Sequence, residues 1–362
     1  MRTGITNLPL HGGNAPKWLF ERMKRLGGEI VTAIIFEFGT ATFLKKIADP
    51  VWFQALGCVL GFDWHSSGLT TTTCGALKEG IKGREKSLGL FICGGKGATS
   101  RKTPEQIENY SLITGTNPKS LVYSSKMAAK VDSAALQDGF QLYHHVFFFD
   151  KNGHWAVVQQ GMNTSARTAR RYHWLSDNVA DFVCEPHSGI ISDPPAGGPK
   201  ITLNMIAKES GKARETSTLI SQERPEKTLK LVEEIKTLNM PLKHPLRIVD
   251  LNPKSLEKVL LSTYEKQPRN FEQLLGIKGV GPKTIRSLAL ISEIIYKSPA
   301  SISDPVTYSW AHGGKDGYPY PVNRPVYDQS IEILKTAINK AKIGSREKIE
   351  AIRQLSFFRF NF

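Results

Sequence analysis

The chain has 362 residues and a formal net charge of +15, with a pI near 9.6. Hydrophobic residues make up 40% and charged residues 22%, which is ordinary globular composition and argues against a disordered or fibrous protein. No apolar run reaches the roughly 18 residues of a membrane span, and the basic excess favours a polyanion, chiefly nucleic acid, as partner.

The first half of the chain contains runs rich in β-branched and aromatic residues, which predict strands at 30–38, 88–94, 142–149 and 154–160. Asn152-Gly153 separates the last two runs and predicts an antiparallel hairpin. Helical patterns intervene at 16–26, 42–60 and 103–111. Residues 1–191 therefore indicate an α+β domain around a mixed sheet. The N-terminus lacks a signal-peptide pattern, so we expect a cytoplasmic protein.

A glycine-rich loop follows the strand predicted at 88–94, in the sequence ICGGKGATSRK over residues 92–102. Such a loop can present N–H groups to a phosphate, with Lys96 adding charge. The spacing of a nucleotide-binding P-loop is absent. A phosphodiester contact and a plain surface turn both remain open here.

Three arginines follow the strand predicted at 154–160. We expect a helix within 159–178 that carries Arg167, Arg170 and Arg171 on one face. Three guanidinium groups at the start of a helix would form an anion site and contact DNA. A solvated charged face is the alternative.

Scattered carboxylates in the first half are candidate metal ligands. A metal-dependent phosphodiesterase needs two or three carboxylates around Mg²⁺ or Mn²⁺. Glu37, Asp63 and Asp138 are the candidates, although nothing in their spacing brings them together. Structural roles for single carboxylates are the alternative.

A turn-rich segment at 192–200, SDPPAGGPK, separates the two halves as a linker. Beyond it, helical patterns dominate, and residues 200–362 hold 27 of the basic and 17 of the acidic residues. Residues 201–362 therefore predict an all-α domain that contains most of the basic excess. The predicted helices cover 201–213, 225–240, 253–265, 271–276, 282–297, 325–342 and 345–355.

The sharpest motif is FEQLLGIKGVGPKTIRSLALI at 271–291. It resembles a helix-hairpin-helix, a DNA-binding unit of many repair and recombination proteins. Gly279 and Gly281 permit a tight turn whose N–H groups face an anion at the start of the next helix. Lys278, Lys283 and Arg286 add charge without reading bases. A helical corner that merely packs is the alternative.

A narrower resemblance is to DNA glycosylases of the helix-hairpin-helix class, which place a lysine after the hairpin and a catalytic aspartate about twenty residues later. Lys283 and Asp304 occupy those places. The resemblance implies that Lys283 attacks the sugar and forms a Schiff base while Asp304 stabilises the developing charge. The chain departs from that family after Asp304, where Pro305 follows, and Asp304 as a helix cap is the alternative.

Strings spread over nearly the whole chain resemble a further family. They include LPLHGGNAPKWLFERM, ADPVWFQALGCVLGFDWHSSGLTTT and DPVTYSWAHGGKDG, and the chain is identified by them as a member of the family called domain of unknown function 763. The resemblance implies a prokaryotic, intracellular protein with a helix-hairpin-helix in its second half. It supplies no catalytic residues.

These observations predict a DNA-binding protein of DNA repair or processing that grips the phosphate backbone. A metal-dependent nuclease using Mg²⁺ or Mn²⁺ is the leading enzymatic hypothesis. The alternatives are a noncatalytic recruitment module and a glycosylase or lyase. A small-molecule enzyme explains neither the hairpin nor the charge of +15.

Overall fold

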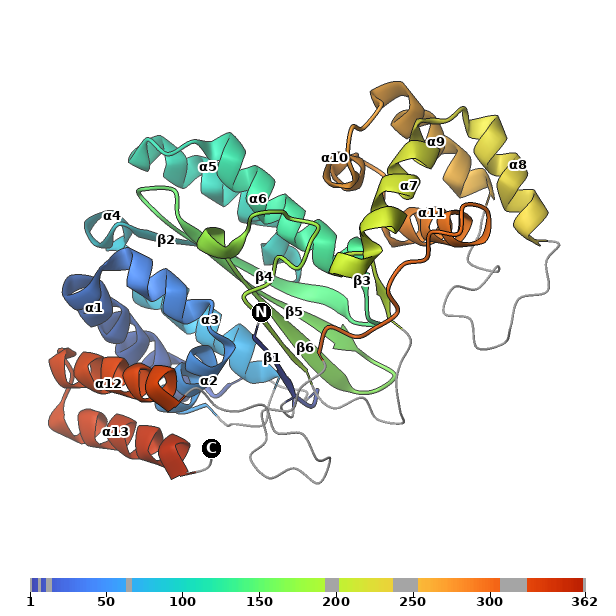
Figure 1. Cartoon of the computed structure of the whole chain (residues 1–362). Helices are drawn as coiled ribbons and strands as arrows, with labels where there is room; N and C mark the ends of the chain where they lie inside the picture. Colours follow the sequence, from blue (N-terminus) through green and yellow to red (C-terminus); the bar gives the residue numbers. More distant parts are fainter. Residues whose placement is uncertain are drawn as a thin grey trace.

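The computed structural model describes residues 2–5, 8–10, 15–62, 67–192, 202–236, 253–306 and 324–360. At its centre lies a six-stranded sheet (Figure 1) in the order β1-β7-β6-β5-β4-β2. Its strands β1 and β7 are parallel, and its other neighbours are antiparallel. A mixed sheet in an α+β fold is thereby confirmed. The strands span Arg2–Ile5 (β1), Leu90–Lys96 (β2), Gln141–Asp150 (β4), Trp155–Asn163 (β5), Thr168–Leu175 (β6) and Gly189–Ser192 (β7).

Strands β4 and β5 form the hairpin that Asn152-Gly153 predicts. Along β4, side chains alternate between two buried cores, because successive residues of a strand point to opposite faces of a sheet. Phe147 and Phe149 enter one core, whereas Val146 and Phe148 enter the other. The sheet is therefore covered on both faces.

Six helices cover the face that Val146 and Phe148 enter. Helices α1 to α4 come from the start of the chain, and α12 and α13 from its end; Figure 1 shows the last two beside α1 and α2. The helices span Lys17–Ile47 (α1), Pro50–Val59 (α2), Gly68–Gly80 (α3), Glu85–Leu88 (α4), Arg324–Lys340 (α12) and Ser345–Phe360 (α13).

The opposite face is covered by α5 and α6, and a bundle of α7 to α11 packs beside α6 (Figure 1). A two-stranded antiparallel sheet of β3 and β8 joins the bundle to the rest. These elements span Thr103–Thr114 (α5), Pro118–Lys130 (α6), Val131–Ala135 (the π-helical turn η2), Leu136–Gln137 (β3), Leu203–Asn204 (β8), Gly211–Gln222 (α7), Pro225–Lys236 (α8), Pro253–Lys266 (α9), Phe271–Gly276 (α10) and Pro282–Ile294 (α11).

The strand predicted at 30–38 is wrong, because these residues lie within α1. The buried residues Met23, Ile30, Val31 and Ile34 recur at the spacing of one helix face, and they pack in the core shared with α3. Packing along this face outweighs the β-propensity of the Ile and Val residues.

The predicted all-α unit over 201–362 does not form one packed body. Its last helices, α12 and α13, contribute Leu334, Ile338 and Leu355 to the core of α1 and α2, while α7 to α11 share the core on the opposite face. The start of the segment is also not one helix, since it contains β8 before α7 begins at Gly211. Most of the predicted linker, residues 193–200, lies outside the described residues.

Candidate nucleic-acid interface

Helices α10 and α11 are joined by a tight turn over residues 277–281, here called the α10–α11 turn. The side chain of Asn270 accepts a hydrogen bond from the N–H of Gln273 at 2.9 Å and caps the start of α10. Gly279 has a φ of +96°, a conformation that favours glycine. Pro282 then begins α11 at the predicted position, and the helix ends at Ile294, three residues before the predicted end.

Backbone N–H groups of the α10–α11 turn are available for a ligand. Among the described residues, the N–H groups of Gly279, Gly281 and Lys283 have no hydrogen-bond acceptor. They lie at the N-terminal end of α11, where the helix dipole favours an anion. The side chains of Lys278 and Lys283 are exposed beside them. The turn therefore combines free donors with positive charge.

Carbonyl groups of the same turn are held by residues from the first half of the chain. The ammonium group of Lys130, the last residue of α6, donates to the carbonyl of Val280. The side chain of Gln137 on β3 donates to the carbonyl of Pro282 at 2.9 Å and accepts from the Arg286 guanidinium at 2.9 Å. Arg286 is thus partly engaged within the protein. These bonds fix how the turn sits on the sheet.

Next to this junction lies an ion-pair cluster. It consists of Asp138 on the loop after β3, Arg170 on β6, and Asp304. The Arg170 guanidinium donates to Asp138 at 2.8 Å and to both carboxylate oxygens of Asp304, at 3.1 and 2.8 Å. Burial alone would lower the pKa of Arg170, but the two carboxylates raise it above its ordinary value. The pKa of Asp138 is raised by burial, against the opposing effects of Arg170 and Tyr172.

Asp304 is therefore bound to an arginine, while Lys283 is exposed on the first turn of α11. No contact joins Lys283 to Asp304 among the described residues. The carboxylate has 24% of its side chain exposed, so it is reachable from solvent at one edge. The arrangement gives Asp304 a structural role in anchoring residues 301–306 to the sheet.

The helix predicted to carry three arginines is wrong. Residues 168–175 form strand β6, so Arg170 and Arg171 point to opposite faces of the sheet. Both are buried, and Arg171 donates to Gln54 at 2.9 Å and to His173 at 2.9 Å. Arg167 is exposed in the preceding turn with a φ of +54°. These arginines do not form one anion-binding surface.

The glycine-rich segment predicted as a loop begins within β2, which runs to Lys96, and continues as a 3-10 turn, Gly97–Lys102, that leads into α5. Lys96 is exposed at the end of β2, and α5 begins at Thr103. A Cβ at Gly94 would lie 2.2 Å from the His145 carbonyl oxygen, so the backbone packs closely there. Lys78 donates to the Gly94 carbonyl at 2.8 Å. The close packing of β2 on β4 is enough to require a glycine at position 94, with no ligand involved. A phosphate contact by Lys96 stays a prediction.

The predicted metal ligands do not converge. Glu37 lies on α1 and pairs with Lys340 of α12, whereas Asp138 pairs with Arg170 on the opposite face of the sheet. Asp63 lies outside the described residues. No group of three metal-ligating side chains is found in the described part of the chain. The sheet itself keeps Glu37 and Asp138 apart.

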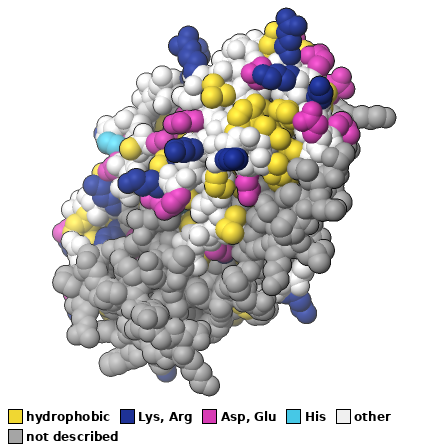
Figure 2. All heavy atoms as spheres, turned by 45° about the vertical axis from the view of Figure 1, so that its right-hand side comes forward, with side chains coloured by type: hydrophobic (Ala, Val, Ile, Leu, Met, Phe, Trp, Pro, Cys, Tyr) yellow, Lys and Arg dark blue, Asp and Glu magenta, His cyan; other side chains and the backbone are white. Residues whose placement is uncertain are grey.

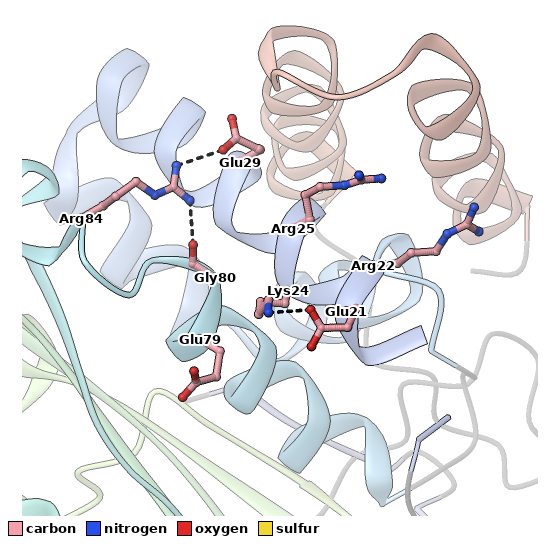
Figure 3. A pocket seen from close by; sticks show the side chains of 8 residues that line it. All are labelled: Glu21, Arg22, Lys24, Arg25, Glu29, Glu79, Gly80 and Arg84. Atoms are coloured by element: carbon pink, nitrogen blue, oxygen red, sulfur yellow. Dashed lines mark hydrogen bonds and ion pairs between the residues drawn. The ribbon is translucent and has the colours of Figure 1, made fainter. Parts of the chain in front are cut away.

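A charged cavity between α1, α3 and α4 is drawn in Figure 3. Three of its four basic groups are already paired: Arg84 donates to Glu29 at 2.9 Å and to the Gly80 carbonyl at 2.6 Å, Lys24 lies 2.5 Å from Glu21, and Arg25 pairs with Glu347. Lining acids offset these cations, so the cavity is an ion-pair network with little preference for an anion.

A buried serine and histidine also resemble a catalytic pair. The Ser125 hydroxyl lies 2.8 Å from His145 Nε2, and His145 Nδ1 lies 2.8 Å from the side-chain amide oxygen of Gln159. Because that oxygen only accepts, Nδ1 carries the proton and Nε2 accepts from Ser125. Ser125 is 2% exposed. No substrate reaches this hydroxyl, so the pair is part of the core.

The surface that holds the bundle mixes both signs of charge. Figure 2 shows lysines, arginines and acidic side chains interspersed around hydrophobic ones on this side. Among the coloured residues of this view no patch of a single sign stands out, so we base a candidate phosphate site here on the local geometry of the α10–α11 turn. Sequence reasoning found Lys278, Gly279 and Lys283, but it missed Lys130 and Gln137, whose partners are distant in the chain.

The fold and this turn define a mixed α+β protein with a basic two-helix turn mounted on one side of its sheet. The chain belongs to the family described as protein of unknown function (DUF763), whose sequence model matches residues 4–322. Comparisons with curated proteins and with solved structures give no significant match. Among the described helices, none has the length and apolar character to cross a bilayer.

Proposed function

We propose that this protein binds the phosphate backbone of DNA through the α10–α11 turn, as a protein of DNA repair or processing. The observation that carries the proposal is a set of three N–H groups, those of Gly279, Gly281 and Lys283, that have no acceptor among the described residues and lie at the start of α11 beside two exposed lysines. This arrangement resembles a helix-hairpin-helix. Backbone N–H groups contact phosphates and leave base edges unread, so we infer low sequence specificity.

Orientation of the turn supports the same proposal. Lys130 and Gln137 occupy the carbonyls of Val280 and Pro282, on the side that faces α6 and β3. The carbonyl side would repel a phosphate, and it is covered by the protein. The donor side is left to solvent, which is the polarity that an anion requires.

Catalysis on DNA has weaker support than binding. A metal-dependent nuclease has no assembled ligand set in the described residues, and Asp304 is engaged by Arg170 where a lyase would use it to assist Lys283. A noncatalytic recruitment module requires neither a metal site nor an activated lysine, so it is the simplest interpretation of the described geometry. Nuclease and lyase activity are therefore outcomes to be tested.

The test is a DNA panel of single-stranded, duplex, branched and abasic molecules, each with Mg²⁺, Mn²⁺ or EDTA. We expect binding to duplex DNA that the double variant Lys278→Glu, Lys283→Glu abolishes. The double variant Lys82→Glu, Lys86→Glu is the control, since it changes the charge equally on exposed lysines near α4. Equal binding by both variants would overturn the proposal.

The same panel separates the activities. Metal-dependent cutting supports a nuclease, whereas borohydride trapping of a covalent adduct on abasic DNA, lost in Lys283→Ala, supports a lyase. Binding without cutting supports the module.

A further inference from the structure

Helix α6 exposes a row of basic residues that the sequence motifs did not include. Lys119, Tyr123, Lys126 and Lys130 are three or four residues apart, so they share one helix face. Lys119, Tyr123 and Lys126 are exposed, and Lys130 is half-buried at the end of the row. The opposite face of α6 enters the core through Leu121 and other apolar residues. We call these four residues the α6 row.

The α6 row runs beside α10 and ends at the α10–α11 turn. The Tyr123 hydroxyl bonds to the carboxylate of Glu272 at the start of α10, and Lys130 bonds to Val280 within the turn. Gly276, at the end of α10, lies against Met127. Contacts at the two ends of α10 and at the turn beyond it place α6 and α10 side by side. The exposed residues of the row therefore lie next to α10, and the row ends at the turn.

Charge on this surface is not neutralised locally. Among the described residues, Lys119, Lys126, Lys278 and Lys283 form no ion pair. The acid in contact with the row, Glu272, accepts from the Tyr123 hydroxyl and keeps its negative charge, but no lysine of this surface pairs with it among the described residues. Four exposed ammonium groups can therefore bind phosphates, two on α6 and two at the α10–α11 turn.

We propose that the α6 row is a second backbone-binding surface, and that one DNA duplex spans both it and the α10–α11 turn. This inference rests on the proposed function. The row from Lys119 to Lys130 is ~16 Å long at 1.5 Å per helical residue. With charges about 3.4 Å apart along each strand, it covers about five base pairs. A duplex that engages both surfaces is therefore longer than one that engages the turn alone.

The test measures affinity by fluorescence anisotropy for a DNA stem-loop of about 6 base pairs and for a duplex of about 20. Lys119→Ala, Lys126→Ala is compared with Lys278→Ala, Lys283→Ala and with the control Lys82→Ala, Lys86→Ala; circular dichroism checks folding of each. We expect the α6 variant to lose roughly tenfold affinity for the long duplex, and little for the short stem. The turn variant weakens binding to both.

Different failures are distinguishable. If the turn variant weakens binding and the α6 variant matches the control on the long duplex, the second surface is overturned while the proposed function stands. Equal losses by the α6 variant on both DNA lengths would overturn the spanning geometry. If neither variant differs from the control, the proposed function falls as well.

Discussion

Lys130 and Val280 connect the two halves of the sequence: the ammonium group at the end of α6 donates to the carbonyl within the α10–α11 turn. Burial lowers the pKa of Lys130, so its charge is kept at a cost and is held by this contact. The contact positions the donor side of the turn toward solvent. Lys130 is thus a positioning residue for the proposed phosphate site.

Replacing Lys130 tests this role. We expect Lys130→Met to weaken binding to the short stem by roughly fivefold to thirtyfold, because one carbonyl–ammonium bond worth about 1–2 kcal/mol is lost. The slope of log K against log salt should change by less than it would on loss of one phosphate contact, because Lys130 contacts a carbonyl and not the DNA. Lys130→Arg should restore most of the affinity. A Met variant with unchanged affinity would contradict the positioning role.

Gly279 and Gly281 give a matched pair of substitutions. Gly279→Ala should destabilise the protein by about 1–2 kcal/mol, because its φ of +96° is unfavourable for a side chain. Space is not the cause, since a Cβ there would meet Val259 at 3.7 Å. Gly281 has an extended backbone, so Gly281→Ala should cost a few tenths of that. Urea unfolding measures both, and equal costs would contradict the described turn.

The Arg170 cluster predicts an ordering of stabilities. Arg170→Met should cost about 3 kcal/mol, because Asp138 is left buried and without its cation. Asp304→Asn should cost about 1 kcal/mol, since Asp304 is partly exposed and Asp138 keeps its partner. Urea unfolding at neutral pH tests the order, and a larger cost for Asp304→Asn would contradict it.

His144 predicts a loss of stability in acid. Its ring nitrogens are buried and have no hydrogen-bond partner among the described residues, and burial, with repulsion between His144 and the neighbouring His145 and Lys96 when the rings are protonated, lowers its pKa from 6.5 to about 3. Between these values the unfolded chain binds a proton that the folded protein does not. The free energy of unfolding should therefore fall as pH drops below 6.5, by about 1.4 kcal/mol per pH unit.

His144→Leu should remove that part of the slope while the stability at pH 8 is kept or raised, since no hydrogen bond is lost. The measurement is urea unfolding from pH 8 to pH 4 for both proteins. Parallel curves would show that His144 does not titrate on unfolding.

The predictions were correct where residues close together in the sequence determine the structure. The Asn152-Gly153 hairpin and the start of α11 at Pro282 depend on residues within a few positions of the turn. The error at 30–38 arose because the partners that select a helix there lie in α3, far along the chain. The error at 168–175 arose because arginines in a buried strand look like a charged helix face until Asp138 and Gln54 are placed beside them.

The sequence predicted the residues that would donate to a phosphate, but not the residues that hold the turn in place. Gly279 and Lys278 lie inside a local motif, whereas Lys130 and Gln137 reach the same turn from about 150 positions away. The sequence around Lys130 gives no sign that its ammonium group bonds to the carbonyl of Val280. The packing of α12 and α13 in the core of α1 and α2 was missed for the same reason, because their partners there are distant in the chain.

The salt dependence of duplex DNA binding tests the central claim most directly. Affinity is measured from 50 to 300 mM salt for the unaltered protein, for Lys278→Ala, Lys283→Ala and for the control Lys82→Ala, Lys86→Ala. We predict that the slope of log K against log salt falls by about 2 for the turn variant, and not for the control, because each lost lysine releases about one counterion fewer. An unchanged slope and affinity in the turn variant would contradict the account.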